Sequence, residues 1–245
     1  MNSKIIDQFI DHLWLEDGLS KNTLNSYRLD LNLFSQWLNK DLEKNILDVS
    51  QADIQEYLAF KFPTSKSRSI SRLLATLRRL FRYLLRENKI TIDPTLEIQS
   101  PKIPKSLPKS LSEEDIESLL AAPNLEKSSG LRDKAMLELL YACGLRVSEL
   151  VNILLTELSL TEGIVRVTGK GSKTRLVPMG EEAVDWIKKY INEGRKDILK
   201  QQSSKYLFVT LRGQAMTRQA FWYLIKRYSI LAKINKPMSP HILRH

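Results

Sequence analysis

Four prolines within one short stretch constrain the fold of this chain more than any other feature. Pro94, Pro101, Pro104 and Pro108 lie between Asp93 and Ser112, and helical patterns stand on both sides. Proline cannot continue a helix and favours an extended backbone. The sequence therefore predicts an N-terminal domain over residues 1–92, a linker over 93–111 and a C-terminal domain over 112–245. Lysines alternate with the prolines, so we expect the linker to contact a polyanionic partner as well.

The pattern of the N-terminal domain predicts four helices. Apolar residues recur at helical spacing from Ile5 to Leu13, and again after Ser20, a residue type that favours helix N-caps. Ser50 and Asp53 indicate the start of a shorter helix. The long helix after that has one apolar side, and its other side carries Arg68, Arg72, Arg78, Arg79, Arg82 and Arg86.

The C-terminal domain combines helices with one clear strand pair. Ser112 and Asp115 indicate a helix start, and further helices are predicted over 131–142, 181–193 and 217–231. The β-rich runs GIVRVT (163–168) and TRLVP (174–178) flank GKGSK, which predicts a hairpin with a glycine-containing loop. The expected fold is therefore mainly α, in two domains, with a small β-hairpin or sheet.

The charge is unevenly distributed along the chain. The net charge is +10, but residues 61–89 hold nine Lys/Arg against the single acid Glu87, and residues 205–245 hold eight Lys/Arg and no acid. Two separate acid-poor blocks favour a polyanionic partner such as nucleic acid. The alternative is a solvated basic surface without a partner.

Several classes of protein are disfavoured by composition. The single cysteine, Cys143, excludes an intrachain disulfide and a cysteine-rich metal site, and it is typical of a reducing cytosol. Asp7 and Asp11 interrupt the apolar N-terminus, so we do not expect a signal peptide there. No uncharged apolar run approaches 18 residues, and we expect a cytoplasmic protein that does not span a membrane.

Three motifs are candidates for chemistry. In GKGSK the glycines bracket Lys170 between two strands, which is not the strand–helix context of a nucleotide-binding loop. Lys170 could reach into a nucleic-acid groove, or the loop could be a turn with solvated lysines. In GLRVSEL, Arg146 needs an anion, either a ligand or Glu149 three residues on, which would form a pair that fixes a helix start.

The third motif is HILRH at residues 241–245. On a helix, His241 would share a face with Arg244 and with His245. Zinc would lack ligands, since His12 is the only other histidine, so phosphate fits better than a metal and no cofactor is expected. Taken together, Arg146, Lys170, His241 and Arg244 form an all-basic set, which suits phosphoryl transfer without a metal ion.

The order of GLRVSEL, hairpin lysine and HxLRH resembles the tyrosine recombinases of the phage integrase family. GLSKNTLNSYRLDL and MTRQAFWYLIKRY are similar to the bacterial Xer recombinases. The resemblance implies an N-terminal SAM-like core-binding domain and a C-terminal catalytic domain that clamp DNA. It also implies that Arg146, His241 and Arg244 bind the cleaved phosphate and that Lys170 protonates the leaving 5′ oxygen. The residues expected to contact DNA are Ser20, Asn22, Thr23, Tyr27, Arg68, Arg72, Arg78, Arg79, Arg82, Lys173, Arg175, Thr217, Arg218 and Gln219.

The same resemblance places a nucleophilic tyrosine after the second arginine. All eight tyrosines of this sequence precede Ser239. We therefore expect a catalytic domain truncated before its nucleophile, which binds DNA without cleaving it.

The resemblance further implies a partner set and a cellular role. The partners would be a duplex recombination site, a second related recombinase subunit in a heterotetramer, and a cell-division DNA translocase as activator. The role would be resolution of chromosome dimers at the nucleoid. Two alternatives remain: a type IB topoisomerase, which the N-terminal match disfavours, and a non-catalytic DNA-binding regulator or excision factor.

Overall fold

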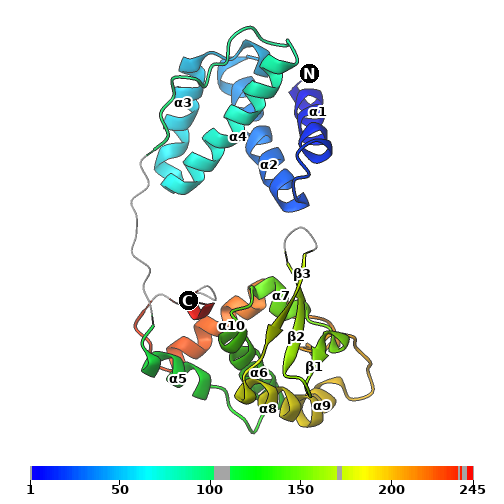
Figure 1. Ribbon diagram of the computed structural model, residues 1–245. Coiled ribbons are helices and arrows are strands. Elements are labelled where there is room, and N and C mark those ends of the chain that lie inside the picture. The colour runs from blue at the N-terminus through cyan, green and yellow to red at the C-terminus, as the bar shows by residue number, and fades with distance from the viewer. Residues whose placement is uncertain (1, 102–110, 170–172, 237, 239–241, 245) are drawn as a thin grey trace. The chain divides into compact units, whose positions relative to one another are not determined.

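The computed structural model describes residues 2–101, 111–169, 173–236, 238 and 242–244, and its chain divides into two compact units, 1–106 and 107–245 (Figure 1). Each unit buries its own cluster of apolar side chains. The expected fold class, mainly α with a small sheet, is confirmed. Within the described residues, no helix is both long enough and apolar enough to cross a bilayer.

The N-terminal unit is built from the four predicted helices. They are α1 (Asn2–Leu15), α2 (Lys21–Trp37), α3 (Gln51–Lys61) and α4 (Ser67–Arg86), with short turns η1 (Leu38–Leu42), η2 (Ile46–Asp48) and η3 (Phe62–Thr64) between them. Ser20 caps α2, and Ser50 and Asp53 form a capping box at α3, as the sequence predicted. The apolar side of α4 is buried against α1 and α2, which leaves its arginine side outward.

The first part of the predicted linker packs onto the N-terminal unit. Thr95 donates its backbone N–H to Asp93 Oδ1 at 2.8 Å, and Ile98 is buried in the N-terminal core. Arg78 donates to the carbonyl oxygen of Ile98 and, at 2.9 Å, to Ser100 Oγ. Apolar burial and the bonds from Arg78 therefore hold residues 98 and 100 on the N-terminal unit.

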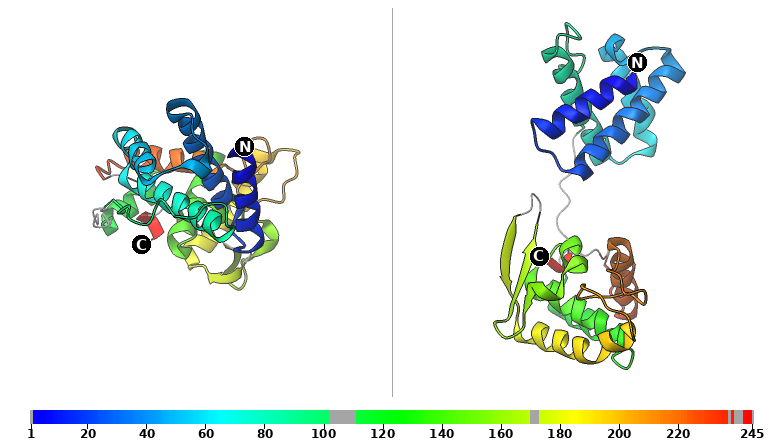
Figure 2. Two further views of the ribbon diagram at one scale, coloured as in Figure 1. Left: turned by 90° about the horizontal axis from the view of Figure 1, so that it is seen from above. Right: turned by 90° about the vertical axis from the view of Figure 1, so that its right-hand side faces the viewer.

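The C-terminal unit surrounds one central helix, α6 (Ser128–Cys143). Around it lie α5 (Glu113–Ala121), α7 (Val147–Asn152), α8 (Glu181–Lys189), α9 (Arg195–Leu199) and the short turn η7 (Ile242–Arg244), all of which contact α6 (Figure 2). Helix α10 (Arg218–Leu231) packs against α5 and α7. Ser112 and Asp115 form the predicted capping box of α5. The helix predicted over 181–193 is instead α8, a π-helical turn η6 (Tyr190–Gly194) and α9.

A three-stranded antiparallel sheet covers one side of this unit. The predicted hairpin is β2 (Ile164–Thr168) and β3 (Thr174–Pro178), with Val167 opposite Arg175. The short strand β1 (Leu158–Ser159), which follows η4 (Leu155–Glu157), pairs with β2 and was not predicted. Val165 and Val167 are buried, while Arg166 between them points to the exposed face.

Candidate DNA phosphate site

Arg146 is placed by a sharp turn between α6 and α7. Gly144 ends α6 with φ of 54°, in the left-handed region that glycine enters without strain. Leu145 is then buried, which anchors the turn in the core. Arg146 follows as the N-cap residue of α7, and its side chain is 47% exposed.

The carboxylate of Glu149 is the centre of the site. Its side chain is 3% exposed. Oε1 accepts from Arg146 Nη1 at 2.9 Å, and Oε2 accepts from the Arg146 backbone N–H at 2.8 Å. Arg175 adds two bonds, from Nη1 to Oε1 at 2.9 Å and from Nη2 to Oε2 at 2.8 Å. The hydrogen bonds from Arg175, together with those from Arg146, outweigh burial and lower the pKa of Glu149 to about 2.

The base of the β2–β3 loop lies directly against these charges. Gly169 donates its backbone N–H to the carbonyl oxygen of Lys173 at 2.8 Å, which closes the hairpin. A Cβ at Gly169 would lie 3.4 Å from Arg146 Nη1, Arg175 Nη1 and Glu149 Oε1. The residue that precedes Lys170 therefore lies close to the guanidinium of Arg146.

The other expected catalytic residues are only partly described. Lys170 and His241 lie outside the described residues, and for Arg244 the structure gives the backbone turn η7 alone. Leu243 and Met238 are buried in the core of this unit, and Lys236 Nζ donates to Asp115 Oδ2 at 2.6 Å. These contacts fix the chain on both sides of His241, but the convergence of all four side chains remains a prediction.

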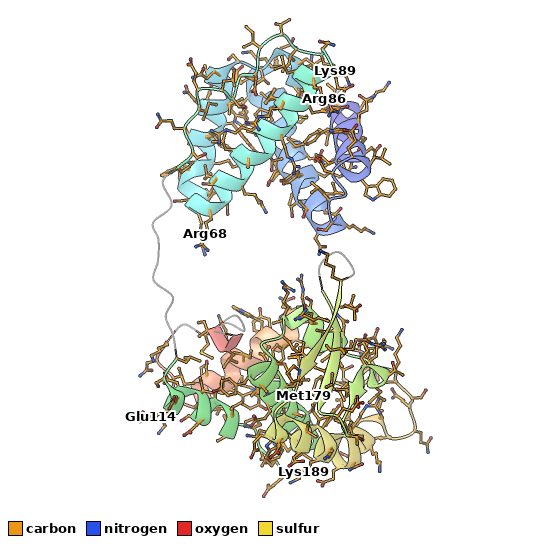
Figure 3. All side chains as sticks on the ribbon, in the orientation of Figure 1. Arg68, Arg86, Lys89, Glu114, Met179 and Lys189 are labelled. Carbon is orange, nitrogen blue, oxygen red and sulfur yellow. The ribbon has the colours of Figure 1, made fainter. Side chains whose placement is uncertain are left out.

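The expected DNA-contacting arginines of α4 differ in their surroundings. Arg72 Nη2 donates to the buried Asp30 at 2.9 Å, and Arg79 Nη2 donates to Asp17 at 2.9 Å. Arg79 also lies 6.0 Å from the centroid of the Tyr27 ring. Arg68, in the first turn of α4, projects outward from the helix (Figure 3), and Arg82 is exposed as well. The basic side of α4 is thus partly neutralised by acids of other elements, which the sequence pattern did not reveal.

The remaining expected contacts lie at two helix N-termini and just before β3. Ser20 and Thr23 bond to each other at the start of α2, where Asn22 is exposed. Thr217 caps α10 by accepting from the backbone N–H of Ala220, with exposed Arg218 and Gln219 beside it. Lys173 is exposed next to the hairpin loop. Helix N-termini present backbone N–H groups that suit phosphate.

Sequence reasoning considered Glu149 only as a partner of Arg146. It did not identify the bond to Arg175, because that bond joins residues 26 positions apart through the fold. It also did not identify Asp133 on α6, whose carboxylate is 1% exposed. Asp133 accepts from Arg132, Arg227 and the Tyr228 hydroxyl.

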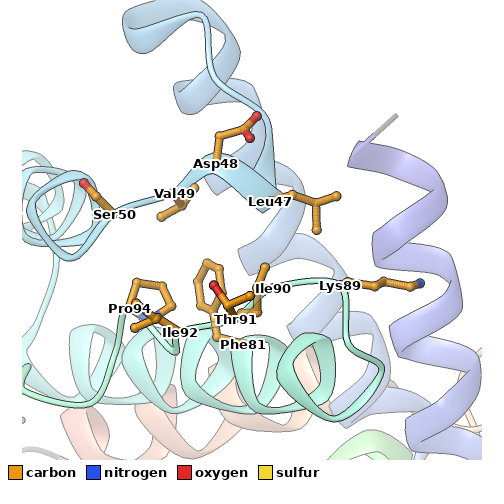
Figure 4. Close-up of a pocket in the computed structure, with 10 residues that line it drawn as sticks. All are labelled: Leu47, Asp48, Val49, Ser50, Phe81, Lys89, Ile90, Thr91, Ile92 and Pro94. Atoms are coloured by element: carbon orange, nitrogen blue, oxygen red, sulfur yellow. The ribbon is translucent and has the colours of Figure 1, made fainter.

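A hollow of about 400 Å³ in the N-terminal unit lacks the paired charged groups that surround Glu149. It lies between η2 and the segment after α4 and is lined mainly by Leu47, Val49, Phe81, Ile90, Ile92 and Pro94 (Figure 4). The two charged side chains at its edge, Asp48 and Lys89, point away from it. The hollow therefore offers no pair of charged groups to a phosphate.

Comparisons with known families match both units. The phage integrase family model matches residues 109–245, and the model of the phage integrase N-terminal SAM-like domain matches residues 6–88. Tyrosine recombinase XerD of Pseudomonas putida is 52% identical, in a match that covers 100% of this chain and 82% of that protein. Tyrosine recombinase XerD of Proteus mirabilis is 51% identical, over 100% of this chain and 78% of that protein.

Solved structures show the same fold at lower identity. A lambda integrase (75–356) dimer bound to a COC′ core site matches with a TM-score of 0.75 and 18% identity, over 99% of this chain and 86% of that chain. XerH site-specific recombinase bound to a palindromic difH substrate, in a post-cleavage complex, matches with a TM-score of 0.74 and 19% identity, over 90% and 66%.

Proposed function

Because this chain belongs to the phage integrase family, as a XerD-like tyrosine recombinase that transfers DNA strands at specific sites, we propose that Arg146 binds the phosphate at which a strand is cut. The observation that carries this proposal is the arrangement of Arg146, buried Glu149 and Gly169. A half-exposed guanidinium is held in place by a buried carboxylate, next to the residue that precedes Lys170.

The chemistry of strand transfer explains why such an arrangement is useful. A tyrosine oxygen attacks the backbone phosphorus, a 3′-phosphotyrosine forms, and the 5′ oxygen of the other strand segment leaves with a proton. Negative charge grows on the non-bridging oxygens during the attack, and a guanidinium that is already oriented stabilises it without reorganisation. The bond energy is kept in the phosphotyrosine, so rejoining needs no ATP.

The other members of the basic set complete this site in our proposal. His241 and Arg244 bind the same phosphate, and Lys170 donates the proton to the leaving 5′ oxygen. Gly169, the residue before Lys170, lies close to the Arg146 guanidinium, and this position supports the role of Lys170.

The 245-residue polypeptide should bind duplex DNA without cleaving it. Two tyrosines of helix α10 are unsuitable as nucleophiles, for different reasons. The Tyr228 hydroxyl is buried and donates to Asp133 at 2.8 Å, and burial and that carboxylate raise its pKa to about 12. Tyr223 is exposed, but it lies on α10 ahead of the phosphate-binding motif.

The cellular role is the more specific part of the proposal. The recombinase resolves chromosome dimers in the cytoplasm at the nucleoid, in a heterotetramer with a second related recombinase on a duplex recombination site, and a cell-division DNA translocase activates it. The observation that supports this assignment is that the chain is 52% and 51% identical in sequence to two proteins named tyrosine recombinase XerD. The N-terminal unit and the C-terminal unit act as core-binding and catalytic domains joined by the proline-containing linker.

The test of the proposal is strand cleavage by the full-length enzyme. The substrate is a nicked duplex whose sequence has been selected for affinity to this protein, so that cleavage traps a covalent adduct. We expect Arg146→Ala to lower adduct formation by about 10²-fold or more, and Arg166→Ala, on the outer face of the sheet, to leave it unchanged. Loss of less than tenfold would refute the role of Arg146. DNA binding with no adduct from the wild-type enzyme would instead favour a non-catalytic regulator or excision factor.

A further inference from the structure

Two arginines share the carboxylate of Glu149, and they use it differently. Arg175 places two N–H groups on two oxygens, in the parallel fork geometry that is specific to guanidinium and carboxylate. The Arg146 side chain gives Glu149 only one bond, from Nη1. Both side chains remain partly exposed, at 47% for Arg146 and 40% for Arg175.

This difference assigns different roles to the two arginines. Arg175 has its fork turned inward, onto Glu149. Arg146 has only one of its side-chain N–H bonds directed to Glu149, so the rest of its fork is available to a ligand. We propose that Arg175 is a positioning residue, which occupies Glu149 and thereby keeps the guanidinium of Arg146 turned toward the DNA phosphate. The inference rests on the phosphate-binding role proposed above for Arg146.

The burial of Glu149 gives the physical reason. A carboxylate that is 3% exposed must be compensated by hydrogen bonds and opposite charge. If Arg175 were removed, Arg146 would be the remaining guanidinium bonded to it among the described residues. Arg146 would then close its own fork on Glu149, and its donors would be withdrawn from the phosphate.

The sheet explains why Arg175 can hold this position. Arg175 lies opposite Val167, on the inner face of the hairpin, and Gly169 lies close to both guanidinium groups. The ion pair therefore also joins the loop-bearing end of the hairpin to the first turn of α7. Arg166 lies on the same hairpin but on the exposed face, which makes it a matched control.

The experiment measures binding, so it uses the 245-residue chain itself. The probe is a duplex selected from a random-sequence pool by its affinity for this chain. Single phosphates are replaced, one at a time, by neutral methylphosphonates. In the wild type we expect one linkage at which neutralisation weakens binding by about tenfold or more, as for loss of hydrogen bonds to a charged group. In Arg146→Ala that sensitivity should disappear.

The variants of Arg175 then separate a positioning role from a merely structural one. In Arg175→Met the sensitivity of that linkage should fall below about threefold, and Arg175→Lys should be intermediate, because lysine keeps the charge without the fork. Arg166→Met should behave as the wild type. A structural role would weaken binding to the normal and the neutralised duplex equally and would leave their ratio unchanged.

Each outcome decides one of the two proposals. If no linkage has an Arg146-dependent sensitivity, the role of Arg146 is refuted and this inference falls with it. If the wild type has that sensitivity and Arg175→Met keeps it in full, the inference about Arg175 alone is overturned. Thermal unfolding of each variant checks the fold. If Arg175→Met does not fold, a wild-type ratio in Arg175→Lys overturns the inference.

Discussion

Glu149 is an acidic residue at a site whose other expected members are all basic. It does not cancel their charge, because two guanidinium groups surround one carboxylate and the local sum stays positive. The carboxylate instead fixes where that positive charge lies. Preorganised charge stabilises a transition state better than mobile charge, since nothing must be rearranged during the reaction.

The lowered pKa of Glu149 predicts how its contribution to stability depends on pH. In the folded protein the pKa is about 2, against an ordinary value of 4.5. The stabilisation is therefore complete above about pH 4.5 and is lost as pH falls toward 2, with a maximum of about 3 kcal/mol. Urea unfolding should find Glu149→Gln less stable than the wild type at pH 7, by a difference that shrinks at pH 3. An equal difference at both pH values would contradict this.

At the scale of elements, Asp133 is the point where α10 is tied to α6. Its buried carboxylate accepts from Arg132 Nη2 at 2.8 Å on its own helix, and from Arg227 Nη2 at 3.2 Å and the Tyr228 hydroxyl at 2.8 Å on α10. We expect Asp133→Asn to lower the free energy of unfolding by about 3 kcal/mol, since it leaves buried donors poorly matched. Tyr228→Phe should cost about 1.5 kcal/mol.

The matched control is Tyr223→Phe, because Tyr223 lies on the same helix and its side chain is 58% exposed. That variant should unfold at the wild-type urea concentration. A Tyr228→Phe protein as stable as Tyr223→Phe would show that the bond to Asp133 contributes nothing measurable. The same pair of variants also tests whether Tyr228 is structural, as its burial indicates.

The elements that the sequence predicted well are those with a strong local signal. Helix starts at Ser20, Ser50 and Ser112 follow from side-chain caps, and the β2–β3 hairpin follows from two β-rich runs around glycines. Strand β1 has only two residues and is defined by its pairing with β2. It is therefore too short to be predicted from a periodic sequence pattern. The extension of the N-terminal unit to Ser100 depends on Arg78, which is 22 positions away.

The candidate site likewise contains one contact that the sequence could suggest and others that depend on the fold. Arg146 and Glu149 are three residues apart, so their pairing could be considered from sequence. The bonds from Arg175 to Glu149 and from Arg72 to Asp30 join different elements and depend on how these pack. A sequence motif can therefore identify a candidate phosphate-binding arginine, but the residue that orients this arginine can be identified only from the fold.

At the scale of the whole molecule, the chain contains two units with separate cores. The boundary at residues 106 and 107 falls among Lys102, Lys105 and Lys109. None of these lysines is followed by proline, so each is a substrate for trypsin. We expect brief digestion of the folded protein to give two resistant fragments that end in this region, identified by mass spectrometry. Preferred cleavage within residues 20–90 would contradict the division into domains.

The two basic blocks predict how the whole polypeptide binds DNA. They contain nine and eight Lys/Arg, and neutralising phosphates releases counterions. We expect binding between about 50 and 200 mM salt to weaken with a log–log slope of roughly −5 or steeper.

Exposed Arg68 and Arg82 lie on α4, and replacing both by alanine should reduce the magnitude of the slope by about 2. Replacing Lys188 and Lys189 of α8 removes the same charge from a helix that also carries Glu181, Glu182 and Asp185, and should leave the slope unchanged. Equal slopes for the two double variants would mean that binding follows net charge alone, and no retardation of duplex DNA at about 50 mM salt would refute the assignment of the basic blocks.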